Sequence, residues 1–399
     1  PCVITLDVGG TTTKIGLIKD SHPAMTRDPD LLGVPLKQAM LDLKSIAIGG
    51  GTVARVSGGK LEMGPESMGA FPGPACYDLG GTEATLTDAC LISGYLDANY
   101  FAGGEKKIKR EQAEKVLKEK IAVPLGLNLE DAANEIISKA ADMIAAEITE
   151  LANKTEKPAL DFVLFAFGGN GAVLGCEVAQ KAGIQKSYIF SLGAVLSAFG
   201  SSVADITHTY EYSPLVPVSE HEVLAGMAQE MLQEAQRDME GEGFDLAKLE
   251  AGLDFTLYDQ RDPKNFIQFS SSSWKKADFE EKNINDLIRN SFVDAGKGSD
   301  SEDLIVEVMK LRARLPVAKV QPGKTQPGKE NPSDAHKGER VIRRGGDGIS
   351  STIYDWNKLA AGNTVAGPAV LEGSDTTYVV PQGWRMTMDS YGNGELERS

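Results

Sequence analysis

Histidine and cysteine are scarce in this sequence, and their spacing does not match the common metal sites. Four histidines and four cysteines are scattered over 399 residues, without a C-x-x-C pair. Neither a zinc ribbon nor an iron–sulfur site is therefore indicated, and a His-rich catalytic zinc site is not expected. We expect the cysteines to be free thiols in a reducing cytosol, with Cys76 buried and inert.

Long apolar runs and an excess of positive charge are also absent. No run approaches the length of a membrane span, and the sequence shows no secretory leader, so we expect a soluble, cytoplasmic protein. The formal net charge of -16 argues against nucleic acid and anionic membranes as partners. Any phosphate site in this chain would therefore depend on local backbone amides and a metal ion.

Changes of composition divide the chain into four predicted segments. Residues 1–213 alternate strands with helices, which predicts an α/β domain, and residues 214–318 predict a smaller α+β domain with a helix near 279–293. Residues 319–345 are rich in proline, glycine and lysine, as in a linker or an exposed loop. Residues 346–399 contain short strands and turns, which predicts a small β-rich module.

The stretch VITLDVGGTTTKIGLIKD, residues 3–20, predicts two strands joined by a glycine turn. Glycines let the backbone approach a ligand, and turn amides and hydroxyls can donate to phosphate oxygens. The candidate phosphate-binding residues here are Gly9, Gly10, Thr11, Thr12 and Thr13. Asp7 is a candidate Mg2+ ligand, directly or through water. The alternative is an ordinary hairpin whose side chains bond only to their own turn.

Two further glycine turns follow predicted strands. The first is either a second phosphate turn or a tight hairpin, and we favour a role that faces a ligand; its residues are Gly49, Gly50, Gly51 and Thr52. The second lies between a strand at 162–167 and a helix, where the helix start offers free backbone amides. Its residues are Gly168, Gly169 and Asn170.

A long glycine- and proline-rich loop runs from Gly64 to a predicted helix near Asp88. Irregular loops of this length inside a domain are usually functional or wrap another element. Asp88 is a candidate ligand-binding residue, but Thr87 or Asp88 as the N-cap of the helix explains the pattern equally well.

Six segments of the chain occur in an order that identifies a family. They are LDVGGTTTKIGLI, AIGGGTVARV, GPESMGAFPGPACYDLGGTEATLTDACL, FAFGGNGAVLGCEVAQKAGI, GAVLSAFG and GPAVLEGSDTTYVVPQGW. Together they resemble the hydantoinase A/oxoprolinase family, which includes the ATP-binding subunits of acetone and acetophenone carboxylases. The resemblance covers nearly the whole chain, and the block at 64–77 is its specific part.

The resemblance implies a fold similar to actin, sugar kinases and Hsp70, in which ATP is clamped between two similar domains. It makes residues 7–13 the phosphate hairpin of the second half of the clamp, and Gly168, Gly169 and Asn170 the turn that contacts adenosine. The implied cofactors are ATP and Mg2+. Family chains begin with another Asp-x-Gly-Gly-Thr domain, so we expect a separate chain, or a preceding part of a longer one, to supply the first half.

By this resemblance we expect the nucleotide-binding subunit of an ATP-dependent ketone carboxylase. ATP would phosphorylate bicarbonate, the substrate enolate, or both, with Asp7 as the catalytic Mg2+ partner. The carbon–carbon bond would form on a hydantoinase B-like partner subunit. We therefore expect a hetero-oligomer.

Two alternatives stay open. The same nucleotide site would serve an ATP-dependent hydrolase of hydantoin, oxoproline or lactam rings. Hydrolases of the family often have histidine at the position of Leu174 and aspartate at that of Phe71, which weakens this alternative. The other is a non-catalytic assembly subunit with an incomplete ATP clamp, and a sugar kinase is disfavoured by the Pro-Gly-Pro block.

Overall fold

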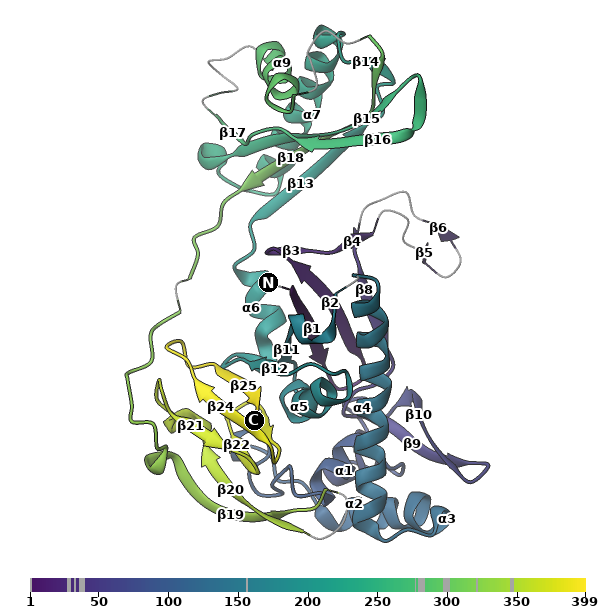
Figure 1. Ribbon diagram of the computed structural model, residues 1–399, viewed down its shortest axis with the longest axis vertical. Coiled ribbons are helices and arrows are strands. Elements are labelled where there is room, and N and C mark those ends of the chain that lie inside the picture. The colour runs from purple at the N-terminus through teal and green to yellow at the C-terminus, as the bar shows by residue number, and fades with distance from the viewer. Residues whose placement is uncertain are drawn as a thin grey trace. The chain divides into compact units, whose positions relative to one another are not determined.

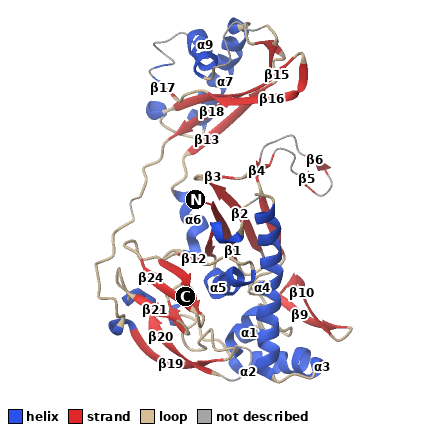
Figure 2. Ribbon diagram, in the orientation of Figure 1, coloured by secondary structure: helices blue, strands red, loops and turns tan. Residues whose placement is uncertain are grey.

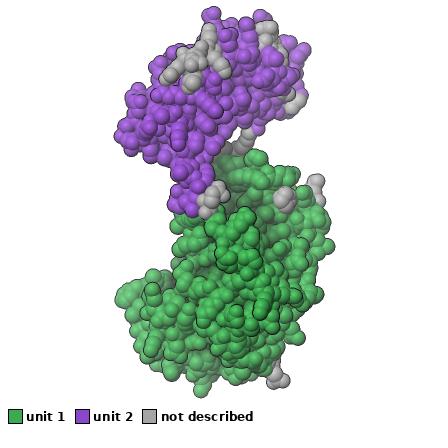
Figure 3. Space-filling model, turned by 90° about the vertical axis from the view of Figure 1, so that its left-hand side faces the viewer, with its two compact units in different colours: residues 1–199, 322–399 green, residues 200–321 purple. Residues whose placement is uncertain are grey.

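The computed structural model describes residues 2–26, 30–31, 34–35, 40–155, 157–276, 278, 284–296, 302–320, 322–344 and 348–399 (Figures 1 and 2). The chain folds into two compact units, coloured separately in Figure 3. Unit 1 comprises residues 1–199 and 322–399, and unit 2 comprises residues 200–321. Among the described residues, no helix has both the length and the apolar character that a bilayer crossing requires.

The main sheet of unit 1 contains the first predicted hairpin, toward one end of its strand order. In sheet order its strands are β21 (Thr364–Ala366), β24 (Trp384–Met388), β25 (Gly394–Arg398), β12 (Lys186–Ile189), β11 (Phe162–Phe167), β1 (Cys2–Val8), β2 (Thr13–Lys19) and β3 (His22–Pro23), with β8 (Leu43–Ile46) also paired to β2. β1 is antiparallel to β2 and parallel to β11. Because Asp7 pairs with Phe167, the turns after β1 and β11 leave the same edge of the sheet.

The helices of unit 1 are α1 (Leu86–Ile92), α2 (Arg110–Leu117), α3 (Val123–Leu125), α4 (Leu129–Asn153), α5 (Gly171–Lys181) and α6 (Leu196–Ser202). α1 and α2 pack against α4. α4 and α5 pack against each other and against the strands (Figure 1). The apolar stripe predicted for α4 is buried, since Ile136, Ile144 and Ile148 are inaccessible to solvent. Alternate residues of β1 and β11 are buried beneath these helices, as expected for strands on a core.

Smaller strand pairs complete the part of unit 1 before residue 199. They are β4 (Met25–Thr26) with β7 (Met40–Leu41), β5 (Asp30–Leu31) with β6 (Val34–Pro35), and β9 (Thr52–Ser57) with β10 (Lys60–Ser67). β9 and β10 form the hairpin that follows the second glycine turn. The four cysteines are buried free thiols, and burial raises the pKa of Cys76, which agrees with the prediction for this residue.

The C-terminal strands belong to unit 1 and do not form a separate module. β25 pairs with β12 in the main sheet, and a second sheet has the order β19 (His336–Ile342), β20 (Ile349–Asp355), β22 (Ala369–Glu372) and β23 (Thr377–Val380). The short strands predicted for this region are present, but β19 lies within the predicted linker. The predicted boundary at 345 and 346 lies outside the described residues. Tyr378 and Trp384 are buried, the former stacked on Trp356.

Unit 2 is an antiparallel sheet with helices on one face (Figure 1). Its elements are β13 (Ile206–Tyr212), β14 (Val216–Pro217), α7 (His221–Gly241), β15 (Glu250–Asp259), β16 (Asp262–Ser270), β17 (Trp274–Lys275), α9 (Ile284–Asp294) and β18 (Leu304–Leu315). Unit 2 starts near residue 200 rather than at 214, because β13 pairs along β18. The predicted helix near 279–293 corresponds to α9, and residues 279–283 lie outside the described residues.

Candidate functional site

The first two glycine turns of the sequence are bonded to each other. The amides of Gly50 and Gly51 donate to the carbonyls of Gly9 and Gly10, at 3.0 and 2.6 Å. A Cβ on Gly49 would stand 2.6 Å from the backbone nitrogen of Thr11, so glycine is required for this approach. The turn at 49–52 is therefore more than the connection of a hairpin, because it supports the turn at the tip of β1 and β2.

Exposure separates the threonines of these turns into two groups. Thr13 is buried and donates to the carbonyl of Ile48 at 2.6 Å. Thr52 is also buried and accepts from the amide of Gly49 at 2.7 Å. Thr11 and Thr12, in contrast, are exposed. The hydroxyls of Thr13 and Thr52 thus hold the turns together, and those of Thr11 and Thr12 remain accessible to a ligand.

Backbone donors are available in the first turn. The amides of Gly10, Thr11 and Thr12 donate to no acceptor among the described residues, and all three residues are exposed. Adjacent unpaired amides of this kind form sites for anions.

The third glycine turn meets the first through Asn170. The backbone amide of Asn170 donates to the carbonyl of Val8 at 2.9 Å, and its side-chain amide donates to the carbonyl of Gly9 at 3.1 Å. From the C-terminal part of unit 1, the hydroxyl of Thr376 donates to the carbonyl of Gly169 at 2.9 Å. Three segments far apart in sequence therefore converge at one edge of the main sheet.

Asp7 lies at this edge, beside the third turn. Its carboxylate is half-buried and accepts from the hydroxyl of Ser197 at 2.9 Å. Gly168 has a positive φ of 81°, and a Cβ there would stand 2.4 Å from Oδ1 of Asp7. Among the described residues, no group of three or more His, Cys, Asp or Glu side chains is arranged to hold a metal ion. A lone carboxylate fits a Mg2+ ion that is held mainly by phosphates and water.

The carboxylate of Asp88 is enclosed within the protein and holds a neighbouring loop. Asp88 is fully buried, and its carboxylate accepts from the amides of Cys76 and Thr85 at 2.8 and 3.1 Å. The N-cap of α1 is Thr85, rather than Thr87 or Asp88, because Thr85 and Asp88 form a reciprocal capping box. Burial raises the pKa of the Asp88 carboxyl. The carboxylate of Asp88 thus anchors the loop at residues 75–76 on α1.

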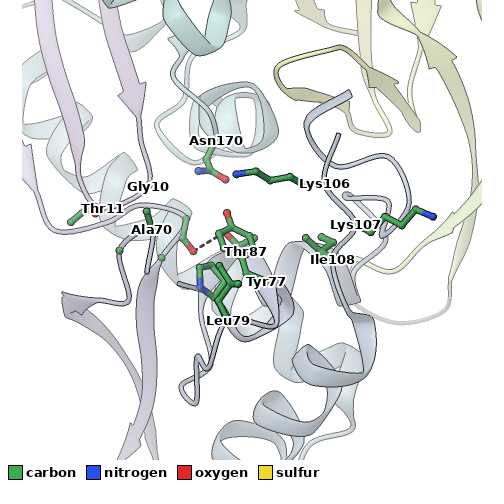
Figure 4. Close-up of a pocket in the computed structure, with 14 residues that line it drawn as sticks. Gly10, Thr11, Ala70, Tyr77, Leu79, Thr87, Lys106, Lys107, Ile108 and Asn170 are labelled. Atoms are coloured by element: carbon green, nitrogen blue, oxygen red, sulfur yellow. Dashed lines mark hydrogen bonds between the residues drawn. The ribbon is translucent and has the colours of Figure 1, made fainter. Parts of the chain in front are cut away.

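A pocket of about 820 Å³ opens where the first two turns meet (Figure 4). Its lining residues are Gly10, Thr11, Gly50, Gly51, Gly69, Ala70, Pro74, Tyr77, Leu79, Thr87, Lys106, Lys107, Ile108 and Asn170. Two of them are lysines and none is acidic, although the chain carries a net charge of -16. The pocket is therefore suited to an anionic ligand.

The predicted site residues fall into two sets with respect to this pocket. Those that line it are Gly10, Thr11, Gly50, Gly51 and Asn170. Those outside the lining are Asp7, Gly9, Thr12, Thr13, Gly49, Thr52, Asp88, Gly168 and Gly169. The sequence analysis missed Tyr77 and Lys106. A basic run at 106–110 in an acidic chain was the available signal for the lysine.

Thr87 and Tyr77 line the pocket next to the second turn. Both the amide and the hydroxyl of Thr87 donate to the carbonyl of Gly50, at 2.8 and 2.9 Å. Burial raises the pKa of Tyr77 to about 12, so its phenol is protonated at neutral pH. Thr87 therefore fixes the second turn, and Tyr77 adds a neutral aromatic surface beside it.

Comparisons with known proteins cover the whole chain. The profile of a family described as Hydantoinase/oxoprolinase matches residues 2–210, and that of the Hydantoinase/oxoprolinase C-terminal domain matches residues 296–396. The chain is 30% identical to the acetophenone carboxylase gamma subunit of Aromatoleum aromaticum, over 99% of this chain and 56% of that protein. It is 28% identical to the caprolactamase subunit alpha of Pseudomonas jessenii, over 99% and 58%.

The fold has a counterpart among solved structures. The nucleotide-free structure of acetone carboxylase superposes with a TM-score of 0.84 at 24% identity, covering 100% of this chain and 58% of the other. This likeness shows a shared mixed α/β fold. The chain spans a little over half the length of the relatives that it matches.

Proposed function

Since the chain belongs to the hydantoinase/oxoprolinase family, we propose that it is the nucleotide-binding subunit of an ATP-dependent ketone carboxylase of acetone or acetophenone type. The observation that carries the proposal is the row of unpaired backbone amides at Gly10, Thr11 and Thr12, beside the pocket where the bonded glycine turns meet. ATP presents a polyanion, and adjacent unpaired backbone amides are groups that bind phosphates. The finer fold that we propose is one half of a clamp like that of actin, sugar kinases and Hsp70.

The residues take distinct roles in this proposal. The amides of Gly10, Thr11 and Thr12 bind phosphate oxygens, with the hydroxyls of Thr11 and Thr12 beside them. Asp7, whose carboxylate lies at the same edge of the sheet and accepts from Ser197, would hold the Mg2+ that accompanies the nucleotide. When bound, this ion neutralises phosphate charge, and the chain positions the transferred phosphoryl group. The turn at 168–170 contacts the adenosine.

A carboxylase is favoured over a hydrolase by two positions. Leu174 is buried in α5, and Phe71 is 80% exposed, so neither supplies the acid–base group that family hydrolases often carry there. The similarity to a caprolactamase subunit keeps hydrolysis of a cyclic amide as the second candidate. We further propose that a hydantoinase B-like subunit carries the carbon chemistry. A separate chain, or another part of a longer natural chain, completes the clamp.

Calorimetric titration with Mg-ATP tests the proposal, on this chain and on the native assembly. We expect binding by the assembly, and a loss of affinity of at least about tenfold in Asp7→Ala, because the carboxylate no longer holds the ion. Asp161→Ala is the matched control, since exposed Asp161 precedes β11 at the opposite end of the sheet from Phe167. Absence of binding in both samples would contradict the proposal and leave the assembly-subunit alternative.

A further inference from the structure

The pocket has two chemically different sides. One side consists of the backbone and hydroxyl groups of the two glycine turns. Another part consists mainly of apolar groups, in Pro74, Tyr77, Leu79 and Ile108, whereas Ala70 lies beside Gly10 at the turns (Figure 4). At about 820 Å³ the pocket is near the upper end of the range for small-molecule sites, roughly 300–1,000 Å³. The apolar groups of the lining carry no charge or polar atom that could bind the phosphates of a nucleotide.

Lys106, which precedes Lys107 and Ile108 in the lining, brings a positive charge into the pocket. Its side chain has no ion-pair partner among the described residues, although carboxylates are numerous in this chain. In Figure 4 the end of Lys106 is directed toward Asn170, across the opening above Thr87, and the end of Lys107 points away from it. A lysine without a protein carboxylate at a pocket wall is available to an anionic ligand.

The backbone that carries Lys106 is fixed from several directions. The amide of Lys106 donates to the carbonyl of Phe101 at 3.3 Å, and the ring of Phe101 lies 5.6 Å from that of Tyr77. After the lysine, the amide of Lys109 donates to the carbonyl of Cys76 at 2.7 Å. The loop is thereby tied to the same segment that supplies the apolar wall, so lysine and wall form one unit.

We infer that Lys106 and the wall of Tyr77, Leu79 and Ile108 form a subsite for a second small molecule, one that carries a single oxyanion on an apolar body. The ammonium group binds the carboxylate or enolate oxygen, and the wall covers the carbon skeleton. This rests on the proposed function, in which the glycine turns beside the subsite hold the nucleotide. Lys106 is then the residue that binds the enolate oxyanion formed from the neutral ketone, or a carboxylate of similar shape.

Benzoate and benzamide are suitable probes, because they share a flat apolar body and differ in charge. Their affinities for the native assembly are measured by calorimetry at fixed ionic strength, for wild type, Lys106→Met and Lys109→Met. Lys109→Met is the matched control, since Lys109 is an exposed lysine of the same loop outside the pocket lining. Exposed side chains of this kind are replaced with little effect on folding, and circular dichroism checks each variant.

We expect benzoate to bind more tightly than benzamide to the wild type. Lys106→Met weakens benzoate about tenfold or more and leaves benzamide and Mg-ATP unchanged, as expected when one charge contact is lost. Lys109→Met changes none of the three. Leu79→Ser weakens both probes, because the wall is common to them.

Three results would overturn the inference. One is the absence of benzoate binding to the wild type, and another is an equal effect of the two lysine substitutions. The third is a loss of Mg-ATP affinity in Lys106→Met with benzoate unaffected, which assigns the lysine to a nucleotide phosphate and leaves the proposed function intact. Conversely, Lys106-dependent benzoate binding without Mg-ATP binding would reject the proposed function and retain the subsite.

Discussion

Replacement of Gly49 by alanine tests whether the two bonded turns act as one structure. The added Cβ would stand 2.6 Å from the nitrogen of Thr11, 2.7 Å from the carbonyl carbon of Gly10 and 2.8 Å from the oxygen of Gly9. All three are backbone atoms, so no side chain can rotate away. The turns must separate, and the bonds from Gly50 and Gly51 lengthen or break.

The cost follows from these contacts. Overpacking in a well-packed region costs about 1–3 kcal/mol, and the loss of two hydrogen bonds adds about 0.5–1.5 kcal/mol each. We therefore expect Gly49→Ala to lower the free energy of unfolding by about 2–6 kcal/mol. The same displacement moves the amides of the first turn, so Mg-ATP affinity falls as well.

Urea unfolding with linear extrapolation measures this free energy. Gly10→Ala is the control, because a Cβ there meets no atom within 4 Å. Its free energy of unfolding should stay within about 1 kcal/mol of wild type. A Gly49→Ala protein within about 0.5 kcal/mol of wild type, which is the usual range for neutral surface changes, would refute the reasoning.

Two further predictions concern buried and paired carboxylates. Asp88→Ala leaves the amides of Cys76 and Thr85 without an acceptor and removes the capping box, so unfolding in urea should require about 3 kcal/mol less free energy; an unchanged midpoint would contradict the anchoring role. In unit 2, the bond from Lys319, with those from the Val317 amide and Arg314, lowers the pKa of Asp205 from 3.8 to about 2. A carboxyl whose pKa is lowered in the folded state stabilises the fold at pH values above its ordinary pKa. This stabilisation is lost as the pH falls through the lowered pKa. The stability difference between wild type and Asp205→Asn should therefore shrink from about pH 5 to pH 2, and a constant difference would contradict this.

The sequence predicted the elements whose signals are local. The strands around the first turn, the strand and helix around the third turn and the apolar stripe of α4 follow from periods of two and 3.6 residues. β19 lacked such a signal, because its sequence HKGERVI contains three charged residues and a glycine. Its pairing with β20 is a tertiary effect that propensity does not contain.

The glycine turns of the site could be predicted from the sequence, whereas the residues that line the rest of the pocket could not. Glycine at 49 was visible, but its reason is a contact with residues 9–11, about forty positions earlier. Asp88 was predicted as a candidate because it is a carboxylate after a glycine-rich loop. Only the folded loop at 75–76 shows that this carboxylate is enclosed. Lys106 stands in a basic run without periodicity, so the sequence gives no orientation for any of its lysines.

The run Thr11-Thr12-Thr13 shows why burial is needed to assign roles within such a turn. Three identical side chains in succession have equal chemistry, yet Thr13 is fully buried and bonded to Ile48, whereas Thr11 and Thr12 are exposed. Since Thr13 begins β2, its bond ties the base of the first turn to the segment that leads into Gly49. The backbone next to Thr11 and Thr12 is thus held in place by the hydrogen bond to Ile48 and by those from Gly50 and Gly51. A ligand at this turn therefore meets donors whose positions are set before it arrives, which lowers the entropic cost of binding.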